Sequence, residues 1–230
     1  MVKYKSPAEK AWITRKTELK KIQNGLTILD CTVKSREGCS EGEYLWQYLK
    51  ILNRQRDVCN FDTLKCFFTH CRCSVKGKYN LQENLRSVPT STIHISGHGN
   101  INKQTGETYL YVGNGALELK HLKGIWSDRD YIDKPLLIVL SACNAGHKDL
   151  IEAFSNEGCR YLIAPVFETD WHKAALFSSL LYTYLFLGEI NGNPLKAHPL
   201  EVITAFRKAK GRLPELTGYW KLFEYGQEKS

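Results

Sequence analysis

The feature that most constrains the fold is a regular alternation of short apolar runs with amphipathic segments. Short β-rich runs are typical of buried strands, whereas apolar residues that recur about one helical turn apart predict helices. An order of strand, helix, strand predicts a mainly parallel sheet with helices on both faces. We expect strands at 25–33, 61–70, 93–96, 135–140, 160–164 and 219–225, and helices at 41–53, 79–88, 148–156, 171–187 and 199–210.

A β-hairpin interrupts this alternation between the third and fourth strands. The short runs 109–112 and 116–119 flank Gly113-Asn-Gly115. Glycine and asparagine tolerate the positive φ angles of tight hairpin turns. We therefore expect an inserted hairpin beside the main sheet.

Composition decides between a membrane protein, a disordered chain and a globular domain. With 230 residues, of which 43% are hydrophobic and 24% charged, the chain has the balance of a globular protein. Its longest apolar candidate, 174–187, is broken by Ser178, Ser179 and Thr183 and falls short of the roughly 18 residues that a membrane span needs. We expect one domain over 25–230, no membrane partner and, without the apolar segment of a secretory signal, a cytoplasmic location.

The positive charge is concentrated at the N-terminus. Residues 1–24 carry seven Lys and Arg against two acids, or +5, which leaves +3 of the total +8 for the remaining chain. Ser6-Pro-Ala-Glu9 has the form of a capping box, and an apolar face that includes Trp12 follows. We expect a basic helix at 1–24 that packs on the domain, with docking of an acidic, regulatory protein partner as the alternative. Nucleic acid is not an expected partner, because the domain itself carries little excess charge.

The eight cysteines lack the pattern of a disulfide framework or of a zinc site. An even cysteine count indicates disulfides in small secreted chains, and this chain is neither small nor expected to be secreted. Cys66, Cys71 and Cys73 lack the spacing of zinc ribbons. His147, four residues after Cys143, is expected to begin a helix rather than to bind metal. Most thiols are expected to pack as small hydrophobic groups, and no metal site is expected.

Two reactive side chains follow predicted strands. His98 comes after 93–96 between two glycines, and Cys143 comes after 135–140 among small residues. The carboxyl ends of parallel strands share one edge of a sheet, so the two side chains meet if their strands are neighbours. Singly, such a cysteine is more often a buried small hydrophobe, and such a histidine a turn residue. Their paired positions favour a functional role, whereas His94 is predicted to be a packed core histidine.

The segments around these two residues resemble the catalytic segments of the caspase-like cysteine peptidases. Ile93-His-Ile-Ser-Gly-His-Gly99 is similar to the histidine segment of that clan, and Ile138-Val-Leu-Ser-Ala-Cys143-Asn-Ala-Gly146 to its nucleophile segment. The clan includes caspases, separase, gingipain, clostripain and the CHAT-domain proteases of bacteria. The Ser-Ala-Cys form is closer to CHAT and separase than to metazoan caspases. Further segments resemble later CHAT landmarks, namely 157–165, residue 170, 184–188, 205–209 and 219–226.

The resemblance implies a caspase-like three-layer αβα sandwich and a cysteine endopeptidase that cleaves a protein substrate. It implies that Cys143 is the nucleophile, that His98 is the general acid/base, and that the backbone N–H groups of Gly99 and Cys143 bind the oxyanion. A thiolate beside an imidazole performs this chemistry without a metal or organic cofactor. Bacterial CHAT proteins are often tied to antiviral defence or regulated cell death, and the resemblance carries that context over as an expectation.

The resemblance also implies a preference for a basic residue at P1, the position before the scissile bond. In the separase-like branch, an acidic residue after the strand that follows the nucleophile strand receives a basic P1 side chain. Asp170 stands at the matching place, with Glu168 two residues before it. The alternative is that Asp170 caps the helix that starts at residue 171, because aspartate is a favoured N-cap residue.

Three rival functions remain open on the sequence. A catalytically silent interaction module would keep its biological activity after Cys143→Ala. An amidase or acyltransferase that acts on small molecules through the same dyad would react with electrophiles in a manner independent of P1. A nucleic-acid binder would lose affinity steeply with salt and on deletion of residues 1–24.

Overall fold

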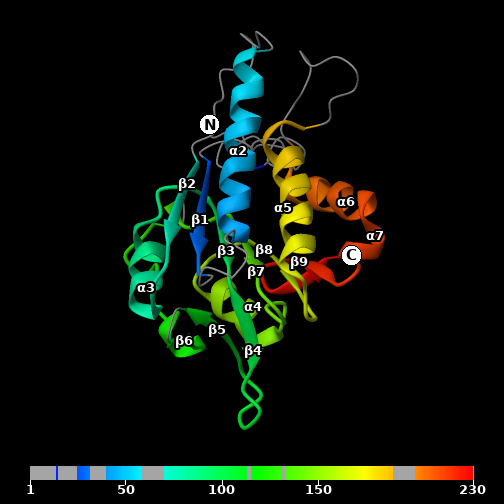
Figure 1. Cartoon of the computed structure of the whole chain (residues 1–230). Helices are drawn as coiled ribbons and strands as arrows, with labels where there is room; N and C mark the ends of the chain where they lie inside the picture. The colour runs from blue at the N-terminus through cyan, green and yellow to red at the C-terminus, as the bar shows by residue number, and fades with distance from the viewer. Residues whose placement is uncertain are drawn as a thin grey trace, which may run out of the picture.

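The chain alternates strands and helices as the apolar periodicity predicts (Figure 1). A computed structural model describes residues 14, 25–31, 40–58, 70–112, 115–130, 133–188 and 200–229. In chain order the elements are β1 (Leu26–Asp30), α2 (Glu41–Val58), β2 (His70–Ser74), α3 (Lys78–Ser87), β3 (Thr92–Ser96), β4 (His98–Ile101), β5 (Thr108–Val112), β6 (Gly115–Leu117), the short 3₁₀ helix η1 (Leu119–His121), β7 (Leu137–Ser141), α4 (Lys148–Asn156), β8 (Tyr161–Pro165), α5 (Trp171–Phe186), α6 (Val202–Arg212), α7 (Pro214–Thr217), β9 (Trp220–Glu224) and β10 (Gln227–Lys229).

The main sheet has seven strands among the described residues, in the order β10-β9-β8-β7-β3-β1-β2. The neighbours from β2 to β8 run parallel, whereas β9 and β10 are antiparallel to the strands beside them. The protein therefore has an α/β fold with a mainly parallel sheet, which confirms that part of the prediction. The carboxyl ends of the parallel strands share the lower edge of the sheet in Figure 1.

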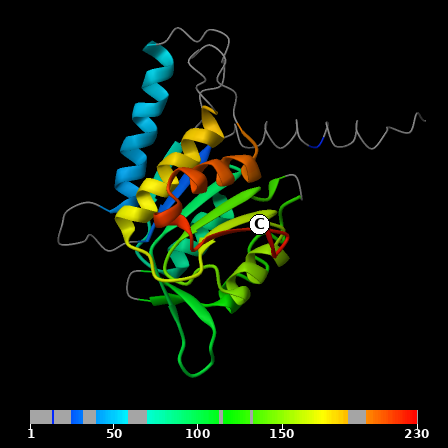
Figure 2. The same ribbon diagram turned by 90° about the vertical axis from the view of Figure 1, so that its right-hand side faces the viewer.

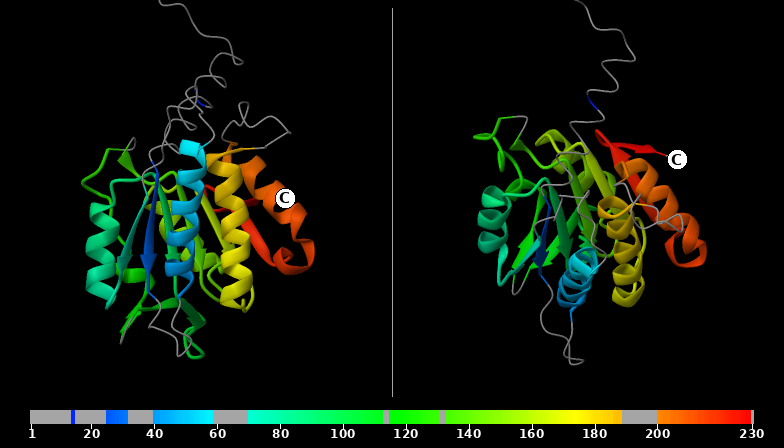
Figure 3. Two further views of the ribbon diagram at one scale, coloured as in Figure 1. Left: turned by 45° about the horizontal axis from the view of Figure 1, so that its top comes forward. Right: turned by 90° about the horizontal axis from the view of Figure 1, so that it is seen from above.

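Helices cover both faces of this sheet (Figures 2 and 3). On one face α2, α5 and α6 pack on the strands, in a core where the rings of Phe177 and Trp220 lie 4.4 Å apart. On the other face α3, α4 and the inserted segment pack around Trp126 and Phe154, whose ring centroids lie 6.1 Å apart. Strands buried on both faces need apolar residues at successive positions, and β7 is buried along its whole length.

The inserted segment is a small antiparallel sheet rather than a lone hairpin. β5 and β6 form the expected hairpin, in which Val112 pairs with Gly115. A third strand, β4, begins at His98 and pairs with β5. The prediction of a lone hairpin was incomplete, because the glycine-rich segment after β3 has the composition of a turn.

Several boundaries differ from the expected ones. α2 continues to Val58 instead of ending at residue 53, and its last turns extend beyond the sheet in Figure 1, where no apolar face is required. β2 covers His70–Ser74, and the remainder of the strand expected at 61–70 lies outside the described residues. The basic helix expected at 1–24 also lies outside them, apart from Thr14. Among the described helices, none has both the length and the apolar content needed to cross a lipid bilayer.

Candidate active site

The register of the sheet brings the His98 and Cys143 segments side by side. β3 and β7 are parallel neighbours, and Ser96 at the end of β3 pairs with Ser141 at the end of β7. The Gly97 N–H donates to the Ser141 carbonyl at 3.1 Å, so the pairing continues past the strands. His98 and Cys143 each follow this pair of serines by two residues. The two strand ends selected from the sequence are therefore neighbours at the carboxyl edge.

The backbone of Gly99 lies against the Cys143 segment. A Cβ placed on Gly99 would overlap the carbonyl oxygen of Cys143 and would lie 3.4 Å from the Cβ of Ala142. A larger residue would force one of the two segments to move. Glycine is therefore required here because β4 and the turn after β7 are in direct contact.

The turn at Cys143 is held by the loop after β8. The Asn144 N–H donates to the Phe167 carbonyl at 3.3 Å, and the Gly146 N–H donates to the Pro165 carbonyl at 2.8 Å. Asn144 has a left-handed φ of 57°, which asparagine adopts at lower cost than most residues. A Cβ on Gly146 would lie 3.0 Å from the Pro165 carbonyl oxygen. The small residues after the cysteine thus allow a sharp turn that packs on the next loop.

The thiol of Cys143 is half-buried and contacts the backbone of Thr169. The Thr169 N–H donates to Sγ at 3.4 Å, and Sγ lies 3.6 Å from the Thr169 carbonyl oxygen. Within the described part of the chain Sγ makes no hydrogen bond to His98, whose imidazole is exposed.

The backbone N–H of Cys143 is one of the two expected oxyanion donors. In the ranges that the structure describes, the backbone N–H of Cys143 donates no hydrogen bond. It is therefore available to an oxygen atom brought to the thiol. The second expected donor belongs to Gly99, whose backbone touches the Cys143 carbonyl. A pair of backbone N–H groups in fixed positions is the usual means of stabilising a tetrahedral oxyanion.

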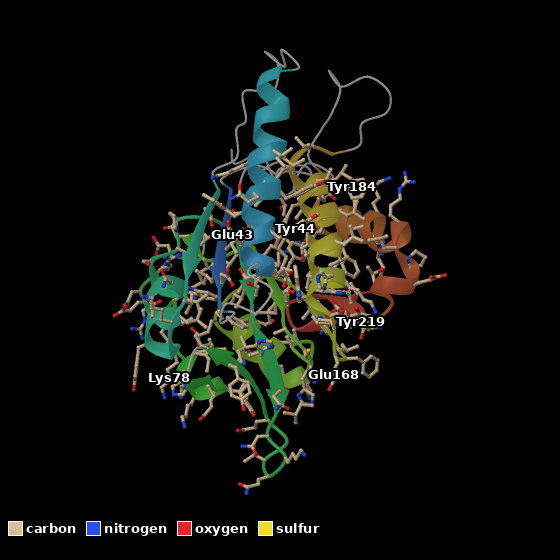
Figure 4. All side chains as sticks on the ribbon, viewed as in Figure 1. Glu43, Tyr44, Lys78, Glu168, Tyr184 and Tyr219 are labelled. Atoms are coloured by element: carbon tan, nitrogen blue, oxygen red, sulfur yellow. The ribbon has the colours of Figure 1, made fainter. Side chains whose placement is uncertain are left out.

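Asp170 is the N-cap of α5. Its Oδ1 accepts a hydrogen bond from the His172 N–H at 2.8 Å and lies 2.9 Å from Nδ1 of the same residue. The hydrogen bond from the His172 backbone, followed by that from its side chain, lowers the pKa of Asp170 below its usual value. Glu168 is exposed on the same loop (Figure 4). The capping role is present, and a role in binding P1 stays a prediction.

A buried polar network lies under the two strand ends. His94 is fully buried, which confirms its predicted core position, and its Nδ1 lies 2.7 Å from the hydroxyl of Tyr182 on α5. Its Nε2 lies 3.3 Å from Oε1 of Glu41, the first residue of α2. The Ser141 hydroxyl donates to the other oxygen of Glu41 at 2.7 Å. Burial, followed by the negative charge of Glu41, raises the pKa of Tyr182 well above its usual value.

The sequence offered no signal for Glu41, Tyr182 or Thr169. An acidic residue in the first turn of a helix is common because it complements the helix dipole. The position of Glu41 in the sequence therefore does not indicate that its side chain is buried. Thr169 meets the thiol through its backbone, which any residue type would supply.

The remaining described thiols differ from Cys143 in their surroundings. Burial, with a smaller contribution from the charge of Asp30, raises the pKa of Cys31 to about 12. Burial also raises the pKa of Cys159 far above its usual value. Of the three cysteine side chains whose accessibility is described, only that of Cys143 is partly exposed.

His147 begins α4, as predicted, with Nδ1 3.4 Å from a carboxylate oxygen of Asp149. Among the described residues, no three His, Cys, Asp or Glu side chains converge as metal ligands would.

No known protein-family model matches the chain, and no curated protein matches it significantly.

Proposed function

We propose that the protein is a cysteine endopeptidase of the caspase-like clan, most similar to its CHAT and separase branches. The observation that carries the proposal is the meeting of two segments, each of which resembles a catalytic segment, at adjacent strand ends with Gly99 against Cys143. The two segments are separated in the chain by the inserted antiparallel sheet. If the resemblances were accidental, nothing would require their strands to pair in register.

The fold supports the proposal. A mainly parallel sheet lies between two helical layers, and a small antiparallel insertion separates the histidine strand from the nucleophile strand. This arrangement agrees with the caspase-like three-layer αβα sandwich that the resemblance implies.

The proposed reaction has two stages. His98 accepts the thiol proton of Cys143, and the thiolate attacks the scissile carbonyl carbon. His98 returns that proton to the leaving amine as the C–N bond breaks, which leaves a thioester on Cys143. A water molecule, deprotonated by His98, then attacks the thioester and releases the acid product and the thiol. The N–H groups of Gly99 and Cys143 stabilise the oxyanion in both stages, and loss of one such donor costs about 100- to 1,000-fold in rate.

The proposal includes a basic P1 preference and a protein substrate. Asp170 and Glu168 are exposed carboxylates on the loop whose Thr169 touches the thiol, so a cationic side chain beside Cys143 would meet negative charge. The regulatory partner at residues 1–24, the cytoplasmic location and a role in defence or regulated cell death belong to the same proposal and rest on the sequence alone.

The test is a fluorogenic peptide library that varies P1. We expect cleavage by the wild type, none by Cys143→Ala, and a loss of about 1,000-fold in kcat for His98→Ala. His147→Ala is the matched control, because it removes a similarly exposed histidine from the helix start that follows the nucleophile turn. Retained cleavage by Cys143→Ala would contradict the proposal, as would equal losses for His98→Ala and His147→Ala.

A further inference from the structure

The inserted sheet presents an exposed face that begins at His98. Directly opposed residues of an antiparallel pair point to the same face. His98 is opposite Tyr111, and Asn100 is opposite Tyr109. These four residues alternate with residues that face the core, such as the buried Leu110. The imidazole and the two tyrosines therefore share one surface.

This surface contains a cavity of about 580 Å³. The rings of Tyr109 and Tyr111 form one wall, in an edge-to-face arrangement with centroids 5.1 Å apart. Most of the other lining residues are polar and carry both charge signs; they include Asn100, Asn102, Lys103 and Glu107. The cavity is thus mixed in character, with flat apolar area next to hydrogen-bonding groups.

Two hydrogen-bond donors on this surface have no acceptor within the described ranges. The Tyr109 hydroxyl donates to the Tyr111 oxygen at 3.2 Å, which leaves the hydroxyl hydrogen of Tyr111 available. Oδ1 of Asn100 accepts from the Ile101 N–H at 2.8 Å, which leaves the amide NH₂ of Asn100 available. Donors beside aromatic rings suit a polypeptide, whose carbonyl oxygens accept hydrogen bonds and whose planar side chains stack.

We propose that this surface binds the part of a polypeptide substrate that follows the scissile bond, from P1′ to about P3′. The inference rests on the proposed function. His98 must protonate the leaving amine, so the P1′ nitrogen has to approach His98 during the reaction. The backbone carbonyl of Cys143 lies against Gly99, and the Tyr111 face begins at His98, the preceding residue of β4. At about 3.4 Å per residue, three extended residues reach roughly 10 Å along this face.

The inference separates an endopeptidase from a hydrolase of small amides. A small amide has no residues after its leaving nitrogen to occupy the cavity, whereas a protein substrate fills it. The tyrosine pair favours a planar side chain, aromatic or guanidinium, at one of the three positions.

The test uses peptides that share one acyl part, with the best P1 residue, and differ in their leaving group: methylamine, one residue, or three residues that include tyrosine. Products are quantified by mass spectrometry. We expect kcat/KM of the wild type to rise about tenfold or more from the shortest to the longest leaving group. The reason is that contacts with substrate residues remote from the scissile bond stabilise the transition state. Tyr109→Ala should lose most of this gain but change the methylamide reaction by less than about twofold.

Two variants serve as controls. Tyr109→Phe keeps the ring and should keep most of the gain, and Tyr79→Ala, which removes an exposed tyrosine from α3, should match the wild type on every substrate. Cys143→Ala should bind the uncleaved longest peptide more tightly than Cys143→Ala/Tyr109→Ala does, which provides a readout independent of turnover.

Equal kcat/KM for short and long leaving groups in the wild type would overturn the inference alone. An equal loss on all substrates in Tyr109→Ala would assign that tyrosine to the integrity of the fold and would overturn it as well. Absence of Cys143-dependent cleavage of every substrate would overturn the proposed function and, with it, the inference.

Discussion

Removal of the Glu41 carboxylate would leave two buried groups without their partner. The Ser141 hydroxyl donates to it, and Nε2 of His94 lies 3.3 Å from it, in a place where the side chains of His94 and Glu41 are 0% and 3% exposed. Leaving a buried donor such as the Ser141 hydroxyl without its acceptor costs about 1–3 kcal/mol. We expect Glu41→Ala to lower the free energy of unfolding by that amount, a large fraction of the total stability of an ordinary domain.

Two milder variants separate the contributions to this loss of unfolding free energy. Glu41→Gln keeps an acceptor for Ser141 and should cost about 1–2 kcal/mol, and Ser141→Ala removes one hydrogen bond and should cost about 1 kcal/mol. In Glu41→Ala/Ser141→Ala no Ser141 hydroxyl is left buried without an acceptor. The double variant should therefore lose less unfolding free energy than the sum of the two single losses. A coupling of about 0.5–3 kcal/mol is typical of groups in direct contact.

The assay is urea unfolding followed by tryptophan fluorescence, since Trp126 and Trp220 are both buried and lie on opposite faces of the sheet. Equal m-values among the variants would show that the changes are in stability. A loss below about 1 kcal/mol for Glu41→Ala, or strict additivity with Ser141→Ala, would refute the reasoning that the carboxylate is the shared partner. If Glu41→Ala does not fold, Glu41→Gln and Ser141→Ala still provide the comparison.

Three further predictions concern the residues around the thiol. Gly99→Ala should lower kcat by about 100-fold or more, because its Cβ would displace β4 from the Cys143 carbonyl and disturb the proposed oxyanion donors; steady-state kinetics under conditions in which unfolding curves show the variant to be folded would test this. Alkylation of the native protein at pH 8, mapped by mass spectrometry, should modify Cys143 well before Cys31 or Cys159, since a pKa of about 12 leaves on the order of 10⁻⁴ of Cys31 as thiolate; early labelling of Cys31 would contradict its burial. Asp170→Asn should keep the helix cap, whereas Asp170→Ala should cost about 1 kcal/mol of stability; if both variants kept the wild-type P1 preference in the peptide library, Asp170 would not form the P1 pocket.

Parts of the fold were predictable because single residues or short runs determine them locally. The apolar run at 135–140 predicts β7, because a strand buried on both faces has no polar positions to alternate with. The bounds of α4 agree with the predicted 148–156, since Gly158, with a φ of 99°, stops the helix. The His98 and Cys143 segments are predictable for a similar reason. In each, small residues follow the end of a strand, and this pattern is visible in a short stretch of sequence.

Other parts depend on tertiary contacts that the sequence does not encode locally. β4 has one apolar residue, Ile101, among its four, and it becomes a strand because β5 pairs with it and Gly99 permits contact with the turn at Cys143. The place of Glu41 beside His94 and Ser141 follows from where α2 begins relative to β3 and β7. The order of the strands in the sheet determines this position, and no residue pattern within α2 indicates it.

The carboxyl edge of the sheet thus carries two layers of polar groups with different roles. The outer layer contains His98 and Cys143, and the inner layer contains Glu41, His94 and Ser141. A silent interaction module would need the inner layer for its stability but would not need the outer one. Its biological activity would survive His98→Ala and Cys143→Ala and would be lost with Glu41→Ala. A peptidase would lose activity in all three variants but stability only in the last, so the two functions are separated by comparing activity and unfolding in the same set of proteins.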